Sequence, residues 1–108
     1  MIAKDIKGFT SKMKEYKKIK VGKSYIEAIA VKLLSKNFIL LRGRKGYIMC
    51  GYLNLGVAKK FKDAAAKIVG VATIEDALKA QIHSCTPVAT KLGIKPGQPV
   101  KEALKIIV

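Results

Sequence analysis

The chain has 108 residues, half of them apolar, which is enough for one domain to bury a core without disulfides or metal ions. A net charge of +15 predicts attraction to anions without identifying a partner. Two cysteines, Cys50 and Cys85, are too few for a disulfide framework and lack zinc-site spacing, so we expect no metal and no cofactor.

The sequence also argues against a membrane protein. No apolar run approaches the roughly 20 residues that a membrane-spanning helix needs. Charged residues occupy the place where a signal peptide has its apolar region, namely Lys4, Asp5 and Lys7. We therefore expect a cytoplasmic protein with no membrane partner.

The first segment, residues 1–15, is a basic N-terminal extension. Its apolar residues recur at alternating spacings of four and three: Ile2, Ile6, Phe9, Met13 and Tyr16. This spacing predicts an amphipathic helix. Packing against its own domain or a sister subunit is the commoner fate of such a helix, and lying on a membrane is the alternative.

A β-rich region, residues 16–53, follows the extension. Strands are predicted over 16–21 and 24–32, with a hairpin turn at Gly22. Two further strands, 37–42 and 47–53, flank a connection whose glycines, Gly43 and Gly46, suit a tight turn. The four strands predict an antiparallel meander.

The remaining half, residues 54–108, is predicted to be mainly helical. Asn54 is a candidate N-cap for a helix whose apolar positions run as far as Ile68 and which should lie on the sheet. The apolar, β-branched run 68–72 then predicts a short buried strand.

Three shorter helices are predicted from their end signals. Thr73 with Asp76 resembles a capping box and opens a helix through residue 80. Thr86 before a proline begins the next helix, which Gly93 ends. Pro99 starts the last helix, over 99–107.

Strands followed by helices predict an α+β protein. We expect a single domain over residues 1–108, a two-layer sandwich with a mostly antiparallel sheet covered on one face by C-terminal helices. The strand over 24–32 is apolar on both sides, and too few helices remain to cover the second side. The β-rich region is therefore predicted to mediate homo-oligomerisation, as a dimer or tetramer.

Several blocks, in this order and spacing, carry a resemblance to a known family. They are residues 35–38, the Gly-Tyr-Ile-Met-Cys-Gly block within 46–53, and the blocks 69–76, 92–97 and 102–104. Over about residues 20–108 the chain resembles the YunC-like family of uncharacterised bacterial and archaeal proteins (domain of unknown function 1805). The resemblance implies a two-layer sandwich and a tetramer formed through the β-rich region, but no activity and no site residues.

Cys50 is the first candidate for chemistry, because it lies beside Gly51, where a ligand can approach closely. Nearby positive charge favours a reactive thiolate, whereas a buried, inert core thiol is the commoner state of a free cysteine. The preceding basic loop predicts an anion site or, more commonly, a solvated hairpin loop. The candidate ligand-binding residues are Arg42, Arg44, Lys45, Gly46 and Gly51.

A second candidate cluster consists of His83 and Cys85, which precede the helix capped by Thr86. A helix N-terminus lowers thiol pKa values and binds anions. One histidine and one cysteine cannot hold a metal unaided. A polar linker is the commoner interpretation of this segment.

These observations favour a small homo-oligomeric binding or assembly module, which is not predicted to be an enzyme, with an anionic small molecule near residues 42–51. One alternative is a small thiol-dependent enzyme that uses Cys50 at a subunit interface. A second alternative is nonspecific nucleic-acid binding, through phosphate contacts because the basic residues are mostly lysine. The low aromatic content, 6%, disfavours it.

Overall fold

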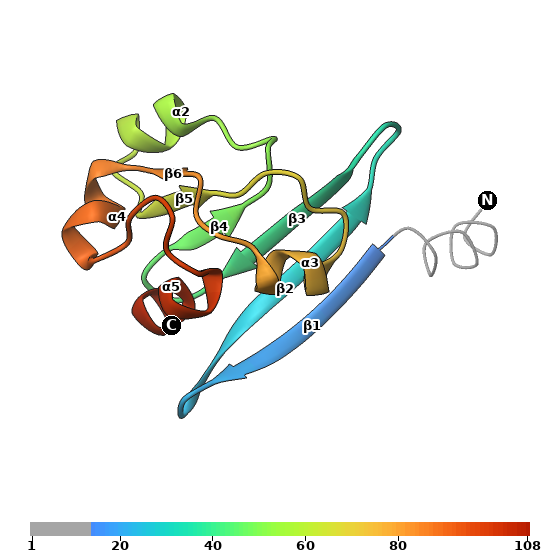
Figure 1. Cartoon of the computed structure of the whole chain (residues 1–108), viewed down its shortest axis with the longest axis horizontal. Coiled ribbons are helices and arrows are strands. Elements are labelled where there is room, and N and C mark those ends of the chain that lie inside the picture. Colours follow the sequence, from blue (N-terminus) through green and yellow to red (C-terminus); the bar gives the residue numbers. More distant parts are fainter. Residues whose placement is uncertain (1–13) are drawn as a thin grey trace, which may run out of the picture.

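The computed structural model describes residues 14–108, and its centre is a six-stranded sheet with the order β1-β2-β3-β4-β5-β6 (Figure 1). The strands are β1 (Lys14–Val21), β2 (Ser24–Lys32), β3 (Asn37–Arg42), β4 (Tyr47–Met49), β5 (Ala65–Lys67) and β6 (Ser84–Cys85). The helices are α2 (Leu55–Lys60), α3 (Ile74–Lys79), α4 (Pro87–Leu92) and α5 (Val100–Ile107). Neighbouring strands are antiparallel except for β4 and β5, which are parallel.

The predicted α+β class and the N-terminal meander are confirmed. Gly22 adopts a φ of 63° between β1 and β2, a conformation that glycine reaches without steric cost. In the register of β1 to β3, apolar residues lie opposite one another: Ile26 is opposite Ile19, and Ala28 is opposite Leu41. Local turn chemistry and alternation were sufficient to specify these three strands.

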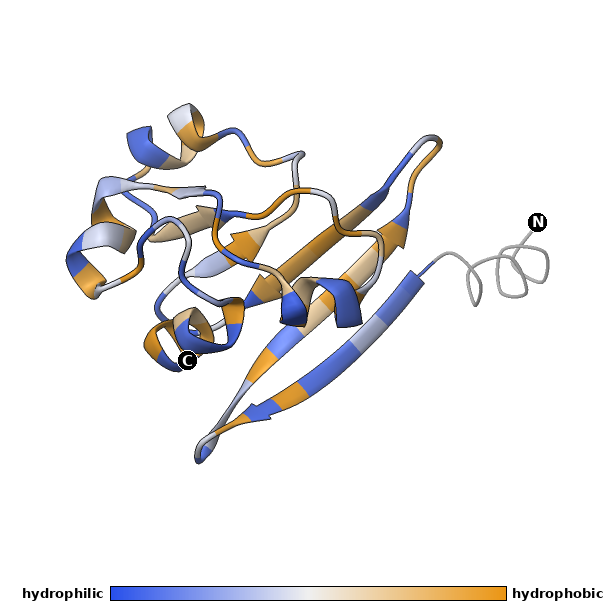
Figure 2. Cartoon of the chain, in the orientation of Figure 1, coloured by the Kyte–Doolittle hydropathy of each residue, from blue (hydrophilic) through white to orange (hydrophobic). Residues whose placement is uncertain are grey.

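The main core lies between one sheet face and three helices. Alternate strand residues are buried on that face, including Ile39, Leu41 and Ile48. The helices α3, α4 and α5 bury their apolar sides in the same cluster: Ile74, Ala77, Ala89, Val100, Ala103, Leu104 and Ile107. Figure 2 shows the apolar stretches of β2 and β3 beneath α3 and α5.

The helix α2 packs on the opposite sheet face. Its Ala58 belongs to a separate buried cluster with Leu53 and Ala65, against which Tyr47 and Met49 pack. This cluster covers only the β4 and β5 part of that face. Among residues 14–108, no helix packs over the same face of β1, β2 and β3, which we call the open face.

The prediction of one helix from Asn54 to Ile68 was wrong. Asn54 does cap a helix, through a 3.1 Å hydrogen bond from the Val57 N–H, but α2 ends at Lys60. Lys62 has a φ of 58°, and the Asp63 N–H closes back on the Ala58 carbonyl at 3.0 Å. The chain thus leaves the helix through a left-handed residue that is not glycine, so the sequence carried no stop signal.

Two strand boundaries also differ from the prediction. The strand expected over 68–72 is irregular chain, and the actual strand is β5, whose alanines pair in parallel with β4. Tertiary pairing overrides the low β propensity of alanine here. The fourth strand ends at Met49 rather than 53, because the Leu53 N–H bonds the Cys50 carbonyl at 3.0 Å and turns the chain.

The segment predicted as a linker, 83–85, contains β6, which pairs with β5. The three C-terminal helices begin close to where their end signals predict. Thr73 and Thr86 accept hydrogen bonds from the third residue of α3 and α4, at 3.0 and 3.3 Å. Gly93 ends α4 with a φ of 109°.

The helix predicted for the N-terminal extension lies outside the described residues up to residue 13. At its end the prediction was wrong, because Lys14, Glu15 and Tyr16 are in β1 and pair with β2. Within 14–108, every helix is too short and too polar to cross a bilayer.

Candidate functional site

A hollow of about 700 Å³ opens where the parallel strands β4 and β5 diverge at their carboxyl ends. Ile68 still bonds β4, through a 2.9 Å hydrogen bond to the Met49 carbonyl, and beyond it the two chains separate. Three segments line the hollow: 35–37, 50–52 and 69–72. Its volume suits a small molecule, and carboxyl ends of parallel strands are where open sheets usually bind ligands.

Cys50 forms the floor of this pocket and is 4% exposed. Its sulfur accepts a hydrogen bond from the Ile39 N–H at 3.3 Å and faces the Asn37 carbonyl at 3.8 Å. These contacts fix the thiol between β3 and β4. The sulfur is therefore held at a defined point rather than exposed on a mobile loop.

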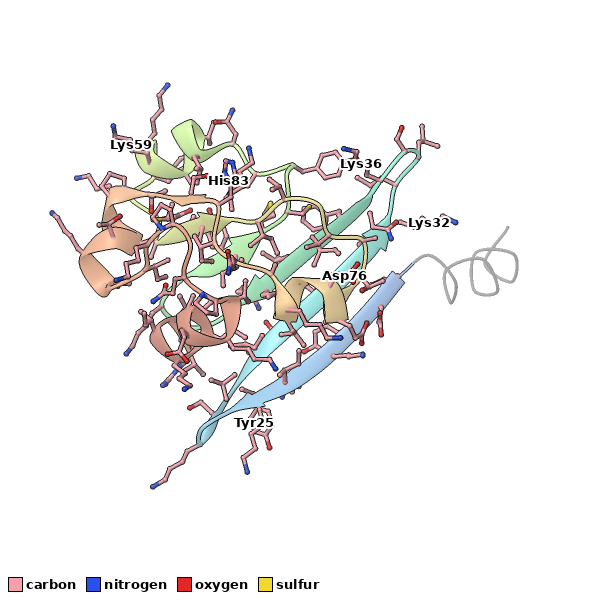
Figure 3. All side chains as sticks on the ribbon, in the orientation of Figure 1. Tyr25, Lys32, Lys36, Lys59, Asp76 and His83 are labelled. Atoms are coloured by element: carbon pink, nitrogen blue, oxygen red, sulfur yellow. The ribbon has the colours of Figure 1, made fainter. Side chains whose placement is uncertain are left out.

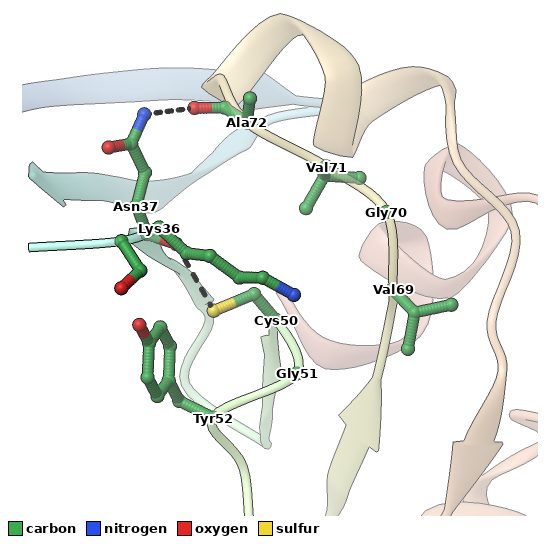
Figure 4. Close-up of a pocket in the computed structure, with 10 residues that line it drawn as sticks. Lys36, Asn37, Cys50, Gly51, Tyr52, Val69, Gly70, Val71 and Ala72 are labelled. Atoms are coloured by element: carbon green, nitrogen blue, oxygen red, sulfur yellow. Dashed lines mark hydrogen bonds between the residues drawn. The ribbon is translucent and has the colours of Figure 1, made fainter. Parts of the chain in front are cut away.

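Lys36 and Tyr52 stand at the rim of the pocket. Figure 4 shows the Lys36 side chain extending across the mouth above Cys50, with its nitrogen directed toward Val69 and Gly70. The Asn37 amide donates a 2.7 Å hydrogen bond to the Ala72 carbonyl and joins the two walls. An ammonium group over an otherwise mostly apolar hollow favours an anionic group on any ligand.

Gly51 is a glycine that the fold does not require. A Cβ atom at this position would meet nothing within 4 Å, and the backbone φ lies outside the left-handed region. Gly70, in the opposite wall, has a φ of 71° and so has a backbone reason to be glycine. Neither Gly51 nor Gly70 donates its N–H to a backbone carbonyl within residues 14–108.

The basic loop lies at the other end of β3 and β4, away from Cys50. Arg42 binds the Glu27 carboxylate through its Nε at 2.9 Å and through Nη2. Arg44 and Lys45 have exposed side chains, and the Lys45 N–H bonds the Ile107 carbonyl at 2.8 Å.

The glycines of the loop serve packing. A Cβ on Gly43 would lie 2.7 Å from the Ile107 carbonyl carbon, and one on Gly46 would lie 3.0 Å from the Ala64 Cβ. Of the residues predicted around 42–51, the structure brings only Cys50 and Gly51 to the pocket.

The second predicted cluster is also apart from the pocket. The His83 ring lies 3.0 Å from the Ser84 hydroxyl, and Cys85 contacts Thr90 at 3.4 Å and the Ile94 carbonyl at 3.6 Å. Figure 3 shows His83 beside β6, well separated from Lys36 on the β2–β3 hairpin. Among the described residues, no three His, Cys, Asp or Glu side chains gather as metal ligands.

Among the groups outside the pocket, Glu27 and Tyr47 have shifted pKa values. A hydrogen bond from Tyr16, 2.8 Å long, and the Arg42 pair lower the pKa of Glu27. Burial, then a 2.8 Å hydrogen bond to Asp63, raises the pKa of Tyr47 to about 12. Glu27 lies on the open face of the sheet, and Tyr47 packs against the cluster beneath α2.

Lys36, Tyr52 and Gly70 line the pocket but were not predicted from the sequence as site residues. A signal for them existed, because the blocks 35–38, 46–53 and 69–76 were singled out by the family resemblance. These three blocks are the ones that meet at the pocket.

The fold and the pocket define the class: a small α+β domain with a ligand-sized hollow beside a parallel strand pair. The family model "Domain of unknown function (DUF1805)" matches residues 49–107, and the chain belongs to this family. The uncharacterised protein YunC of Bacillus subtilis (strain 168) is 42% identical over 81 residues, covering 71% of this chain and 80% of that protein.

Among solved structures, the chain is similar to TA1206 from Thermoplasma acidophilum, a protein of unknown function. The TM-score is 0.86 at 30% sequence identity, over 89% of this chain and 94% of that chain. These relatives are described as being of unknown function, so the comparisons establish family and fold and assign no activity.

Proposed function

We propose that the protein is a cytoplasmic, homo-oligomeric binding module that takes a small anionic ligand in the Cys50 pocket. The observation that carries this proposal is Gly51. A glycine with no steric or backbone reason in the fold faces a hollow of about 700 Å³, where its missing side chain leaves room for a ligand. Lys36 supplies the positive charge. The N–H groups of Gly51 and Gly70, which make no backbone hydrogen bond within residues 14–108, supply donors.

The test is native mass spectrometry of the gently purified protein, which reports a carried ligand as added mass. Gly51→Leu fills the hollow and Lys36→Gln removes its charge, so both variants should lose the added mass. Gly56→Ala, a glycine replacement in α2 outside the pocket, is the matched control and should keep it. Inorganic phosphate and acetate serve as simple probes in a thermal shift assay.

Two results would contradict the ligand proposal. One is a wild-type protein without added mass whose phosphate and acetate responses equal those of Gly51→Leu. The other is added mass that survives in Gly51→Leu. Circular dichroism of each variant separates loss of ligand from loss of fold.

The assembly part of the proposal rests on the open face. By the register of β2 and β3, Ile29 and Val31 point to that face together with Leu40, which lies directly opposite Ile29. These three residues remain only half-buried in the single chain. Strands that are apolar on both faces are usually covered on both faces, and a second copy would supply the cover.

Leu40→Asp tests this assembly, because it places a charge in the proposed interface and not in the helix-covered core. We expect native mass spectrometry to give multimers for the wild type and single subunits for the variant. A wild type that is monomeric at micromolar concentration contradicts the assembly.

A second candidate function is thiol catalysis, favoured by the fixed position of the Cys50 sulfur at the pocket floor. Iodoacetamide labelling of the folded protein tests it, with the half-buried Cys85 as an internal reference. Labelling of Cys50 ahead of Cys85 supports a reactive thiol. A Cys50 that is inert until the protein is denatured removes this candidate.

A further inference from the structure

The charges of the edge strand β1 are sorted between its two faces. On the face toward the helices, Lys17 pairs with Glu15 at 3.3 Å and with Glu75 of α3 at 2.6 Å. On the open face, Lys18 and Lys20 are exposed and make no ion pair within residues 14–108. The edge of the open face is therefore positive.

Two exposed tyrosines lie among these lysines. Tyr25 stands directly opposite Lys20 in the β1–β2 register and is 55% exposed, and Tyr16 is 50% exposed. Figure 3 shows Tyr25 at the end of the β1–β2 hairpin, away from the helices. We call Tyr16, Lys18, Lys20 and Tyr25 the lysine-tyrosine strip.

The strip is preorganised by its neighbours. The Tyr16 hydroxyl donates a 2.8 Å hydrogen bond to Glu27, and Arg42 holds the other oxygen of that carboxylate. Glu27 is the acidic residue closest to the strip in the register, opposite Lys18, and Arg42 already neutralises it. The ring of Tyr16 is thus fixed, and the net charge of the strip stays positive.

We propose that the lysine-tyrosine strip binds single-stranded nucleic acid. Lysines at alternate positions of a strand lie about 7 Å apart along one face and follow an extended phosphate backbone. Half-exposed aromatic rings on the same face provide stacking platforms for bases. Exposed rings favour a single strand over a duplex, because the bases of a single strand are free to stack on them.

This binding site lies beyond the proposed ligand pocket. It borders the assembly interface proposed on the open face, since Tyr16 lies opposite Ile29, so the inference requires that a second copy covers Ile29, Val31 and Leu40 and leaves the Lys20–Tyr25 end of the β1–β2 hairpin free. The pocket is at the β3–β4–β5 end of the sheet, whereas the strip occupies the β1–β2 edge. The low aromatic content that disfavoured nucleic acid at the level of composition matters less here, because two of the seven aromatic residues share one basic strip.

The experiment is fluorescence anisotropy with labelled oligothymidylate and oligouridylate of about 12 nucleotides, the length of one such binding surface. The double substitution Lys18→Glu with Lys20→Glu removes the strip charge. Lys91→Glu with Lys101→Glu, at exposed positions of α4 and α5, changes the net charge equally and is the matched control. Tyr25→Ala and Tyr25→Phe separate stacking from charge.

We expect the wild type to bind both oligonucleotides more weakly at about 200 mM than at about 50 mM salt. The loss of affinity in the strip variant should be at least ten times the loss in the control pair. With two phosphate contacts removed, the slope of log affinity against log salt should fall by about 1.4. Tyr25→Ala should weaken binding by about fivefold or more, and Tyr25→Phe should retain it.

Three results would overturn the inference. Equal losses in the strip variant and the control pair would show that only total charge matters. Equal binding by Tyr25→Ala and the wild type would exclude stacking. Strip-dependent binding to vesicles that contain phosphatidylserine, without binding to either oligonucleotide, would assign the strip to a lipid surface. Lys20→Gln alone, at an exposed strand position, keeps the test valid should the double variant misfold.

Discussion

Gly43→Ala tests the contact between the β3–β4 loop and the end of α5. The new Cβ would lie 2.7 Å from the Ile107 carbonyl carbon and closer still to its oxygen. Overpacking against backbone costs about 1–3 kcal/mol, because backbone atoms cannot rotate away as a side chain can. Moving Ile107 also breaks its 2.8 Å hydrogen bond with the Lys45 N–H, worth about 1 kcal/mol.

The expected loss in the free energy of unfolding is therefore about 2–4 kcal/mol. Urea denaturation at one fixed protein concentration measures it, since assembly makes stability depend on concentration. Gly51→Ala is the matched control, because its Cβ has no neighbour within 4 Å. The free energy of unfolding of Gly51→Ala should be within about 0.5 kcal/mol of the wild-type value or slightly higher. If Gly43→Ala and Gly51→Ala unfold at the same urea concentration, Gly43 does not pack closely against the Ile107 backbone.

Thr86→Val should cost about 2–3 kcal/mol, because the buried Thr86 hydroxyl donates to the Asp63 carbonyl at 2.7 Å and accepts from the Ala65 N–H at 3.1 Å. Thr86→Ser keeps both bonds and should lose far less in the same denaturation assay. Tyr47 should ionise near pH 12 in an absorbance titration, because burial and then the Asp63 hydrogen bond raise its pKa from 10.0 to about 12. The folded state holds this proton more tightly than the unfolded state. The contribution of Tyr47 to the free energy of unfolding should therefore be fully present below pH 10 and be lost as the pH rises toward 12. Tyr47→Phe should remove that part of the alkaline loss, and an unchanged alkaline profile would contradict the assignment.

The parts of the fold that the sequence predicted are those set by local chemistry. A glycine turn, alternating strands and threonine caps specify their elements within a few residues, and the structure has the meander, α3 and α4 where those signals lie. The errors arose where a local signal is missing or the deciding contact is distant. Lys62 ends α2 without a glycine, and β5 is a strand only because β4 lies beside it.

The pocket was only half foreseeable for the same reason. Cys50 and Gly51 could be singled out because a cysteine beside a glycine on a strand is a local pattern. Gly70 is distant from them in sequence and reaches the pocket through the parallel pairing of β4 and β5, which no local pattern indicated. Lys36 comes from the β2–β3 hairpin and reaches the pocket because β3 pairs with β4. The basic loop, by contrast, has the composition of an anion site, but its glycines are occupied by close packing.

The docking of α5 onto the β3–β4 loop has a consequence for biosynthesis. Ile107 completes the hydrogen bonding of Lys45 and lies over Gly43, so residues about 60 positions apart in the chain must meet before the core is closed. During translation the first four strands emerge before α3, α4 and α5, so their core face lacks part of its cover until α5 has left the ribosome. The nascent meander is therefore the stage at which the chain is most exposed to aggregation and most dependent on chaperones.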